Sequence, residues 1–292
     1  MSLSPLLKIK TLALLFPLLC LYGCIKPQPG DSGANTNVVA AAQETKVAEG
    51  ISSGTSLMEQ WTAVAAMDPK TMDLHKGFML AQQMAVPGGE GLEGIFAVLA
   101  DPEQPASAKM LAVVSLGTHV KKEDFNRLKE LTAPDKDIAT RGCAAHLIGS
   151  IETPEAFDLL KQLSQDEALH VRKIAILVLM RKGDGKAVED AAKLWFLPEA
   201  TDADRTEIIY GFPEIFAADH LDLFADALAR TGLEEAVHYH ALQILKTHGT
   251  AAQCESIQKF IDWTKNPNME SFARTVLADI QQRVGASEKG ES

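Results

Sequence analysis

The chain has 292 residues, of which 46% are apolar and 6% are aromatic, and its formal net charge is −11. This length and apolar content are enough to bury a large core, and they exclude a chain that is disordered throughout. The excess of acidic residues argues against nucleic acid as a partner, because the phosphate backbone binds clustered Lys and Arg.

The first residues have the organisation of an export signal. Lys8 and Lys10 precede an apolar run over 11–22, and Gly23-Cys24 follow that run. A basic start, a short apolar segment and a small residue before a cleavage site are typical of a signal peptide. The run is shorter than the roughly 20 residues that span a bilayer, which argues against a membrane-spanning anchor. We therefore predict a signal peptide over 1–23, and its removal with both lysines would change the net charge from −11 to −13.

The segment Leu21-Tyr22-Gly23-Cys24 resembles the lipobox of bacterial lipoproteins, in which Leu, a small residue and Gly or Ala precede a Cys. In that family the Cys is lipidated and becomes the mature N-terminus, so the resemblance implies a lipid anchor at Cys24. Tyr22 departs from the pattern, which leaves ordinary signal-peptide cleavage and a retained anchor as alternatives. Ile25 stands where an Asp retains enteric lipoproteins in the inner membrane, which favours the outer membrane, facing the periplasm.

Composition divides the rest of the chain into three parts. Residues 24–54 are rich in Pro, Gly, Ser, Asn and Ala, which predicts a flexible tether. About 30 residues of this kind have a root-mean-square reach of roughly 30 Å. Residues 55–285 carry the periodic apolar pattern described below, and 286–292 form a short polar tail that we predict to be disordered.

The periodic part repeats every 31 to 33 residues. An anchor position of the repeat is Ala in six units and Ile in one: Ala81, Ala112, Ala144, Ala175, Ile208, Ala241 and Ala273. The position four residues later is also apolar: Ala85, Leu116, Ile148, Leu179, Phe212, Leu245 and Leu277. The position 16 residues before the anchor is apolar as well: Ala65, Phe96, Leu128, Leu159, Ala192, Ala225 and Ile257. Three apolar columns in one register are a strong repeat signal.

The spacing within each unit predicts two helices. Positions i and i+4 share one helical face, whereas helix breakers separate the upstream column from the anchor. These breakers include Pro105, Pro134-Asp135, Thr231-Gly232 and Asn266-Pro267. One helical pair cannot bury its apolar face alone, so neighbouring pairs must stack. The sequence therefore predicts an all-α fold, an α-solenoid of about seven helical pairs wound as a right-handed superhelix.

The fifth unit departs from this pattern. It carries Ile208 at the anchor, and it has Gly211 and Pro213 inside the expected second helix over 204–216. Proline removes a backbone donor and ends or kinks a helix. A bend in the solenoid and a shortened helix both remain open.

Three segments resemble the HEAT-like repeats of phycobilin lyases: 108–117, 137–149 and 170–183. The last reads HVRKIAILVLMRKG, similar to the family pattern of Val-Arg, Ala, Leu and then Gly. The resemblance covers roughly 71–283 and implies the fold, whereas it implies little about activity because one fold hosts many functions.

A basic column lies three residues before the anchors: Lys109, Arg141, Arg172, Arg205 and His238. It either binds an acidic partner or forms a ladder with turn acids, such as Asp137 with Arg141 and Asp204 with Arg205. The densest basic cluster is a candidate contact patch formed by Arg172, Lys173, Arg181 and Lys182.

Aromatic residues give a second set of candidates. Trp195 and Phe196 are candidate partner-binding anchors, because Trp195-Phe196-Leu197 cannot all face inward. Trp61 and Trp263 lie in first helices near the two ends of the repeat region, where burial competes with exposure. Cys143 and Cys254 fall in non-adjacent units, so we expect small apolar fillers rather than a disulfide.

Catalytic and metal motifs are missing from the sequence. It has no HExxH, no Cys pair with metal spacing, no P-loop and no nucleophile elbow, so we expect neither a metal nor a cofactor. His238 and His240 are two apart and point to different helical faces. Deoxyhypusine hydroxylase, a HEAT-repeat enzyme, binds di-iron through His-Glu dipeptides, and no His here is followed by Glu.

The leading hypothesis is a membrane-tethered scaffold or adaptor that binds another protein of the envelope or periplasm and is not an enzyme. The alternative is an enzyme or cofactor-handling protein related to the HEAT-like lyases. A deep polar pocket with a strongly shifted titratable group would favour the alternative.

Overall fold

The computed structural model describes residues 55–86 and 90–290. All regular structure in these ranges is helical, without a strand, which confirms the all-α prediction. The expected signal peptide, the lipidation site Cys24 and the tether lie outside the described residues and stay predictions. Within the described ranges, no helix combines the length and the apolar character that a membrane span requires.

The described residues form two compact units, and the chain passes from one to the other between Val120 and Lys121. The first unit contains two helical pairs, α3 (Leu57–Ala65) with α4 (Leu74–Met84) and α5 (Glu93–Ala100) with α6 (Ala106–Leu116). The indole Nε1 of the buried Trp61 donates to Ser115 Oγ at 2.9 Å and ties α3 to α6. Trp61 is thus a core residue of this unit rather than an exposed anchor.

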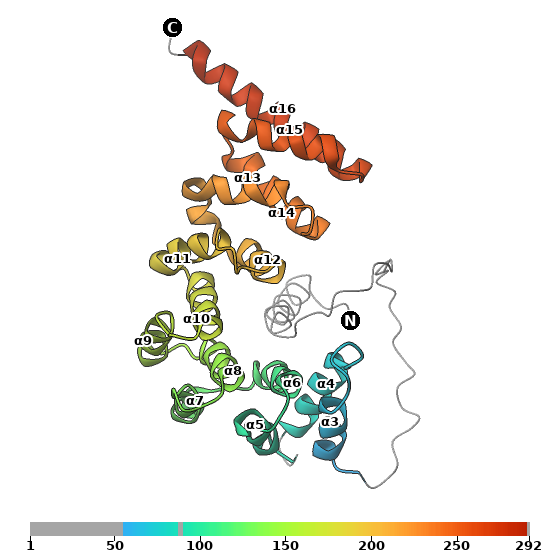
Figure 1. Ribbon diagram of the computed structural model, residues 1–292, viewed down its shortest axis with the longest axis vertical. Coiled ribbons are helices and arrows are strands. Elements are labelled where there is room, and N and C mark those ends of the chain that lie inside the picture. Colours follow the sequence, from blue (N-terminus) through green and yellow to red (C-terminus); the bar gives the residue numbers. More distant parts are fainter. Residues whose placement is uncertain (1–54, 87–89, 291–292) are drawn as a thin grey trace. The chain divides into compact units, whose positions relative to one another are not determined.

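The second unit contains five helical pairs in sequence order, coloured from green to red in Figure 1. Their bounds are α7 (Phe125–Leu131) and α8 (Ile138–Ile148), α9 (Pro154–Leu163) and α10 (Leu169–Arg181), α11 (Gly185–Trp195) and α12 (Asp202–Gly211), α13 (Leu221–Ala229) and α14 (Glu235–His248), and α15 (Cys254–Trp263) and α16 (Pro267–Gly290). Short 3-10 helices precede α7, α13 and α15: η1 (Lys122–Asp124), η2 (Glu214–His220) and η3 (Ala251–Gln253).

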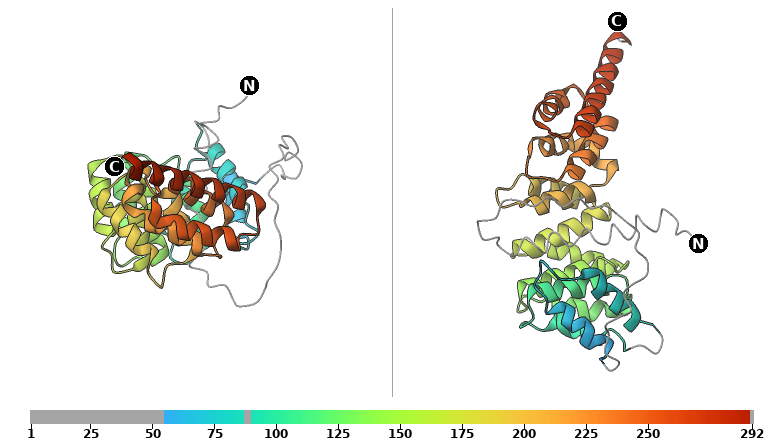
Figure 2. Two further views of the ribbon diagram at one scale, coloured as in Figure 1. Left: turned by 90° about the horizontal axis from the view of Figure 1, so that it is seen from above. Right: turned by 90° about the vertical axis from the view of Figure 1, so that its right-hand side faces the viewer.

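Successive pairs of the second unit stack on one another. The second helices form a row in which α8 contacts α10, α10 contacts α12, α12 contacts α14 and α14 contacts α16. Among first helices, α13 contacts α15 in the same way. Figure 2 shows α16 lying along α15 at the red end of this stack. Stacked neighbouring hairpins are the arrangement of an α-solenoid, as the repeat predicted.

Side-chain caps start several helices of the second unit. The Asp137 carboxylate accepts from the Thr140 amide at the start of α8, and Thr153 caps α9 ahead of Pro154. Asp184 caps α11, while Thr201 and Asp204 form a reciprocal capping box on α12. Each cap satisfies backbone N–H groups that the helix itself leaves without a partner.

The three apolar columns form the core. Every residue of the anchor column and of the upstream column is buried. The third column is buried except for Ala85 and Leu277, which are partly exposed. Ala85 is the residue that ends α4, and in α16 the buried row passes through Val276 and Ile280 instead of Leu277. Both departures thus lie at helices near the two ends of the repeat region.

Small residues allow the second helices to approach closely. Ala144 and Ala175 are fully buried where α8 meets α10. A Cβ on Gly142 would lie 2.8 Å from Ile174 Cδ1, which is closer than side chains pack. The small side chains that the repeat places on this face are therefore needed for the observed packing.

The fifth pair resolves the alternative that the sequence left open. Helix α12 ends at Gly211, and Phe212 and Pro213 are extended before η2 begins. The residue before a proline disfavours helical backbone, which accounts for the early end. The expected helix over 204–216 is thus wrong in its bounds, and the unit has a shortened helix.

The C-terminal helix is longer than the sequence suggested. Helix α16 continues to Gly290 and includes part of the segment 286–292 that we predicted as a disordered tail. Ala, Glu and Lys in this segment are strong helix formers, which accounts for the continuation. The prediction for the cysteines is confirmed, since Cys143 is buried, Cys254 is partly buried and neither forms a disulfide within the described ranges.

Candidate functional site

The predicted basic cluster does not form one patch. Arg172 and Lys173 lie near the start of α10, whereas Arg181 is its last residue and Lys182 follows it. Arg181 comes nine positions after Arg172, which is about 13 Å along the axis. The four basic residues thus lie at opposite ends of one helix.

Three of these four side chains are engaged within the stack. Lys173 Nζ lies 2.7 Å from Asp204 Oδ2, and Arg181 forms a salt bridge to the buried Glu207. Arg172 donates to the backbone carbonyl of Asp166. Only Lys182 is exposed without a salt bridge to any residue in the described ranges. The cluster therefore joins α10 to its neighbours more than it presents charge to a partner.

The basic column has a role that neither sequence hypothesis included. Arg141 Nε donates to the Thr132 carbonyl at 3.3 Å, and Arg205 Nε donates to the Trp195 carbonyl at 3.2 Å. His238 Nε2 lies 3.0 Å from the Arg230 carbonyl. In each case the second helix of a pair supplies a donor to a carbonyl at the end of its own first helix. Those carbonyls have no partner inside the helix, so the column closes each hairpin.

The acids of the expected ladder have other partners. Asp137 caps α8, while Arg141 pairs with Asp166, which belongs to the turn of the next pair. Asp204 pairs with Lys173, and Arg205 pairs with Asp202 at 3.4 Å. Acid–base pairs do recur along the second unit, but most of these salt bridges join neighbouring helical pairs, whereas the ladder was expected within each pair.

The turns between the two helices of each pair line up along one edge of the second unit. Arg141 reaches the next turn through Asp166, and Trp195 Nε1 donates to Asp226 Oδ2 at 2.7 Å. Trp263 Nε1 donates to the Leu228 carbonyl at 3.2 Å. We call this the turn edge, and its turns are 132–137, 164–168, 196–201, 230–234 and 264–266.

The two aromatic candidates on the turn edge differ in exposure. Trp195 is completely buried, and its indole is held by Asp226 and covered by the Arg230 guanidinium 5.6 Å from the ring centroid. Phe196 is 49% exposed. Of the two predicted anchors, only Phe196 offers surface to a partner. The exposed Ile138, where α8 begins, is a further apolar residue on this edge that sequence reasoning did not identify.

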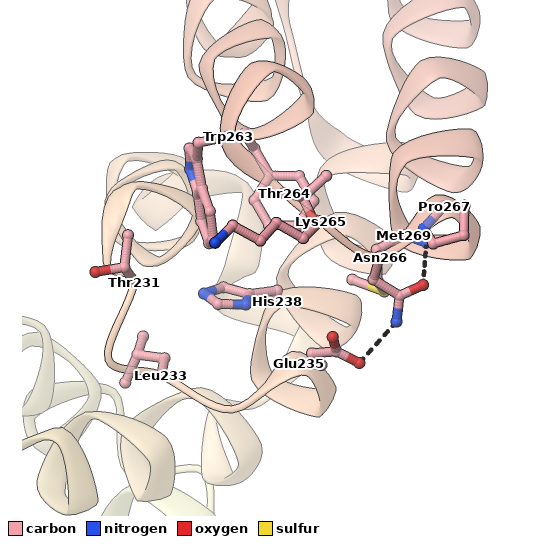
Figure 3. Close-up of a pocket in the computed structure, with 11 residues that line it drawn as sticks. Thr231, Leu233, Glu235, His238, Trp263, Thr264, Lys265, Asn266, Pro267 and Met269 are labelled. Carbon is pink, nitrogen blue, oxygen red and sulfur yellow. Dashed lines mark hydrogen bonds between the residues drawn. The ribbon is translucent and has the colours of Figure 1, made fainter. Parts of the chain in front are cut away.

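A cleft opens on the turn edge between the last two pairs (Figure 3). Its volume is about 810 Å³. It lies between the turn 230–234 and the turn 264–266, and its wall includes the ends of α14, α15 and α16. The lining residues are Thr231, Leu233, Glu235, His238, Phe260, Trp263, Thr264, Lys265, Asn266, Pro267 and Met269.

The floor of the cleft is aromatic. The His238 ring packs between Phe260 and Trp263, with centroid separations of 5.3 and 5.6 Å. Phe260 and Trp263 meet edge to face at 5.1 Å. His238 and Phe260 are buried and Trp263 is partly exposed, so the indole forms the accessible part of this floor.

Burial keeps His238 neutral. Loss of hydration lowers the pKa of His238 below its ordinary value, and the Arg230 and Ala227 carbonyls and Glu235 oppose this shift only in part. Because a carbonyl only accepts, Nε2 must carry the proton that it donates to Arg230. His238 is therefore a structural donor to the end of α13 and is not a free base.

The rim of the cleft carries polar groups from both turns. Asn266 Nδ2 donates to Glu235 Oε2 at 2.8 Å, and Asn266 Oδ1 accepts from the Asn268 amide at 2.9 Å. Figure 3 shows the Lys265 side chain reaching across the cleft between Trp263 and His238. Lys265 is exposed and forms no salt bridge within the described part of the chain. The rim thus presents one free cation and one carboxylate that is already hydrogen-bonded.

Replacing His238 by glutamine tests the neutral state of this ring. Because the folded-state pKa is lowered, His238 favours folding fully above its unfolded pKa of about 6.5, and this contribution falls as the pH drops below that value. Glutamine keeps a donor for the Arg230 carbonyl but does not titrate. We expect urea unfolding to show a loss of stability from pH 7 to pH 5 that is smaller in His238→Gln, by at most about 1.4 kcal/mol per pH unit. Equal pH dependence in the two proteins would contradict a neutral His238.

Comparison with known proteins yields little beyond this geometry. No family model and no curated protein matches the chain. A solved structure of human deoxyhypusine hydroxylase in complex with glycerol matches over 77% of this chain and 97% of its own, with 16% identity and a TM-score of 0.33. Such a low similarity supports no conclusion about activity. Within the described ranges, no three His, Cys, Asp or Glu side chains lie close enough together to hold a metal ion.

Proposed function

We propose that this protein is a membrane-tethered scaffold or adaptor of the bacterial cell envelope that binds another envelope or periplasmic protein. The lipid at Cys24 would hold it to the outer membrane on the periplasmic side, and residues 24–54 would act as the tether. The observation that supports a binding role is the turn edge, where an open cleft and exposed apolar side chains occur on one row of turns.

The turn edge suits a partner more than a purely structural role. Phe196 and Ile138 are about half exposed, and a partner that covers such apolar side chains lowers the free energy by removing them from water. The partly exposed indole of Trp263 adds a third such group in the cleft. Aromatic side chains of this kind dominate the binding energy of protein interfaces.

The same cleft provides the test for the alternative of an enzyme or cofactor-handling protein. Such a protein would need a titratable group that is both shifted in pKa and free to act on a substrate. His238 is shifted, but its Nε2 is occupied by the Arg230 carbonyl. The cleft therefore supports binding in preference to acid–base chemistry.

Site-specific cross-linking in cells tests the scaffold. A photoreactive amino acid at position 196 is expected to trap a defined envelope protein, whereas the same group in place of Lys186 is not. Lys186 is an exposed control near the start of α11, roughly 15 Å from Phe196 along that helix. The trapped product is expected to decrease in a Cys24→Ser variant that also lacks residues 26–54.

Two results would overturn the proposal. One is the same set of cross-linked products at positions 196 and 186, which would indicate random collisions. The other is unchanged membrane fractionation and unchanged trapping after loss of Cys24 and the tether. Incorporation of labelled fatty acid into the wild type but not into Cys24→Ser checks the anchor directly.

A further inference from the structure

The cleft between the last two pairs has the size and lining of a peptide-binding site. Its volume of about 810 Å³ falls within the roughly 300–1,000 Å³ typical of ligand sites. Its two sides are turns of different pairs, with Thr231 and Leu233 on one side and Lys265 and Asn266 on the other (Figure 3). A chain lying between these turns would contact both pairs at once.

The floor selects an apolar side chain. Leu233, Phe260 and Met269 are buried, and the Trp263 indole remains partly accessible above them. The Trp263 Nε1–H already donates to the Leu228 carbonyl, so the indole needs no hydrogen-bond acceptor from a ligand. An aromatic or aliphatic side chain placed there would exchange contact with water for contact with a ring.

The charges of the rim select a carboxylate. Lys265 is the cation of the lining, and its ammonium group forms no salt bridge with any residue in the described ranges. Glu235, the acid of the lining, is hydrogen-bonded to Asn266. Helices α14 and α16 both begin at the cleft, with Glu235 and Pro267, and their first turns add partial positive charge. An anion near Lys265 would therefore be stabilised.

We propose that this cleft binds an extended peptide segment of the partner in which an apolar residue precedes an acidic one. The apolar side chain lies on the part of the Trp263 ring that stays accessible, and the carboxylate pairs with Lys265 Nζ. This proposal rests on the scaffold function, since it names the kind of segment that the scaffold recognises. Glu235 Oε1, which accepts no hydrogen bond from Asn266, is the acceptor for a backbone N–H of the peptide.

Fluorine NMR of the full chain labelled with 5-fluorotryptophan tests the cleft, because the chain has three tryptophans and two of them, Trp61 and Trp195, are buried. The probes are acetyl-Gly-Phe-Glu-Gly-amide, its Gln counterpart in place of Glu, and its Ala counterpart in place of Phe. We expect the Glu peptide to shift the Trp263 signal saturably and to bind about two- to fivefold more tightly than the Gln peptide, because the Gln peptide lacks the ion pair with the exposed Lys265. The Ala peptide should bind more weakly than both.

Matched variants separate specific recognition from general attraction. Lys265→Glu is expected to remove the preference for the Glu peptide, whereas Lys129→Glu, an exposed control on α7, should leave it unchanged. The proposal is overturned if no peptide shifts Trp263 at millimolar concentration, if Trp195 and Trp263 respond alike, or if Lys265→Glu keeps the preference. Cross-linking at position 196 that persists in such a case would leave the scaffold function standing while the cleft proposal fails.

Discussion

Replacing Trp195 by alanine is expected to lower the free energy of unfolding by about 3–5 kcal/mol. The ring is completely buried at the end of α11, and its removal leaves a cavity at the junction between the third and fourth pairs of the second unit. The change also leaves Asp226 without the indole donor, although Arg230 Nε still contacts that carboxylate at 2.6 Å. Urea unfolding followed by far-ultraviolet circular dichroism measures the loss.

Phe196→Ala is the matched control for this change. The two aromatic residues are adjacent in sequence, but Phe196 is 49% exposed, so its truncation is expected to cost about 1 kcal/mol, well below the loss for Trp195. Co-purification of the partner is expected to show the reverse order, since Phe196→Ala removes the exposed surface. Equal destabilisation by the two changes would contradict the assignment of Trp195 to the core.

Replacing Arg205 by alanine is expected to cost about 3 kcal/mol or more. The side chain is buried and donates to the carbonyls of Trp195 and Leu197, at 3.2 and 3.3 Å. Alanine leaves both carbonyls, at the end of α11 and in the turn after it, without these donors, because a methyl group cannot reach them. The same urea experiment, with hydrogen exchange of α11 and α12, locates the effect at this hairpin.

Arg274 provides the control for Arg205. It forms an exposed pair with Glu270 one turn earlier on α16, and such pairs contribute less than about 0.5 kcal/mol. Arg205→Lys should recover little of the loss, since a single ammonium group cannot reproduce the two directed donors of the guanidinium. Full recovery by lysine would show that charge alone, and not closure of the hairpin, is what Arg205 contributes.

The sequence predicted the pairing of helices because its apolar positions recur periodically. Ala144, Ala175 and their equivalents recur at a fixed interval, and burial of one such position requires burial of all. The bounds of α12 were predicted less well. Pro213 marked the disturbance in the sequence, but the choice between a bend and an early end at Gly211 depends on how the following residues pack.

The roles of the basic residues were not readable from the sequence, since they depend on directions in space. The spacing placed Arg141, Arg205 and His238 in one column but gave no sign that their donors reach backbone carbonyls. Backbone carbonyls are present at every residue, so no sequence pattern marks the ones that need a donor. Acidic residues are visible in a sequence, which is why the ladder was predicted from Asp137 and Asp204, whereas Asp166 and Asp202, which pair with Arg141 and Arg205, were not named.

The cleft was predicted only in fragments. Trp263 and His238 were each singled out, the first as an aromatic candidate and the second as a member of the basic column. Their meeting depends on the stacking of two pairs, which brings together turns about 30 residues apart in sequence. Lys265 carried no signal of its own, because an isolated lysine before Asn-Pro is indistinguishable from any solvated turn residue.

The hydrogen bonds and salt bridges along the turn edge join one helical pair to the next. Arg141 with Asp166 and Trp195 with Asp226 are examples, and neither contact extends beyond the neighbouring pair. The exposed side chains between these contacts, such as Phe196 and Lys265, contribute little to the stability of the stacked pairs. Mutation at one turn is therefore free to alter what that turn recognises while the others keep their specificity. A row of this kind can diversify its recognition one turn at a time during evolution.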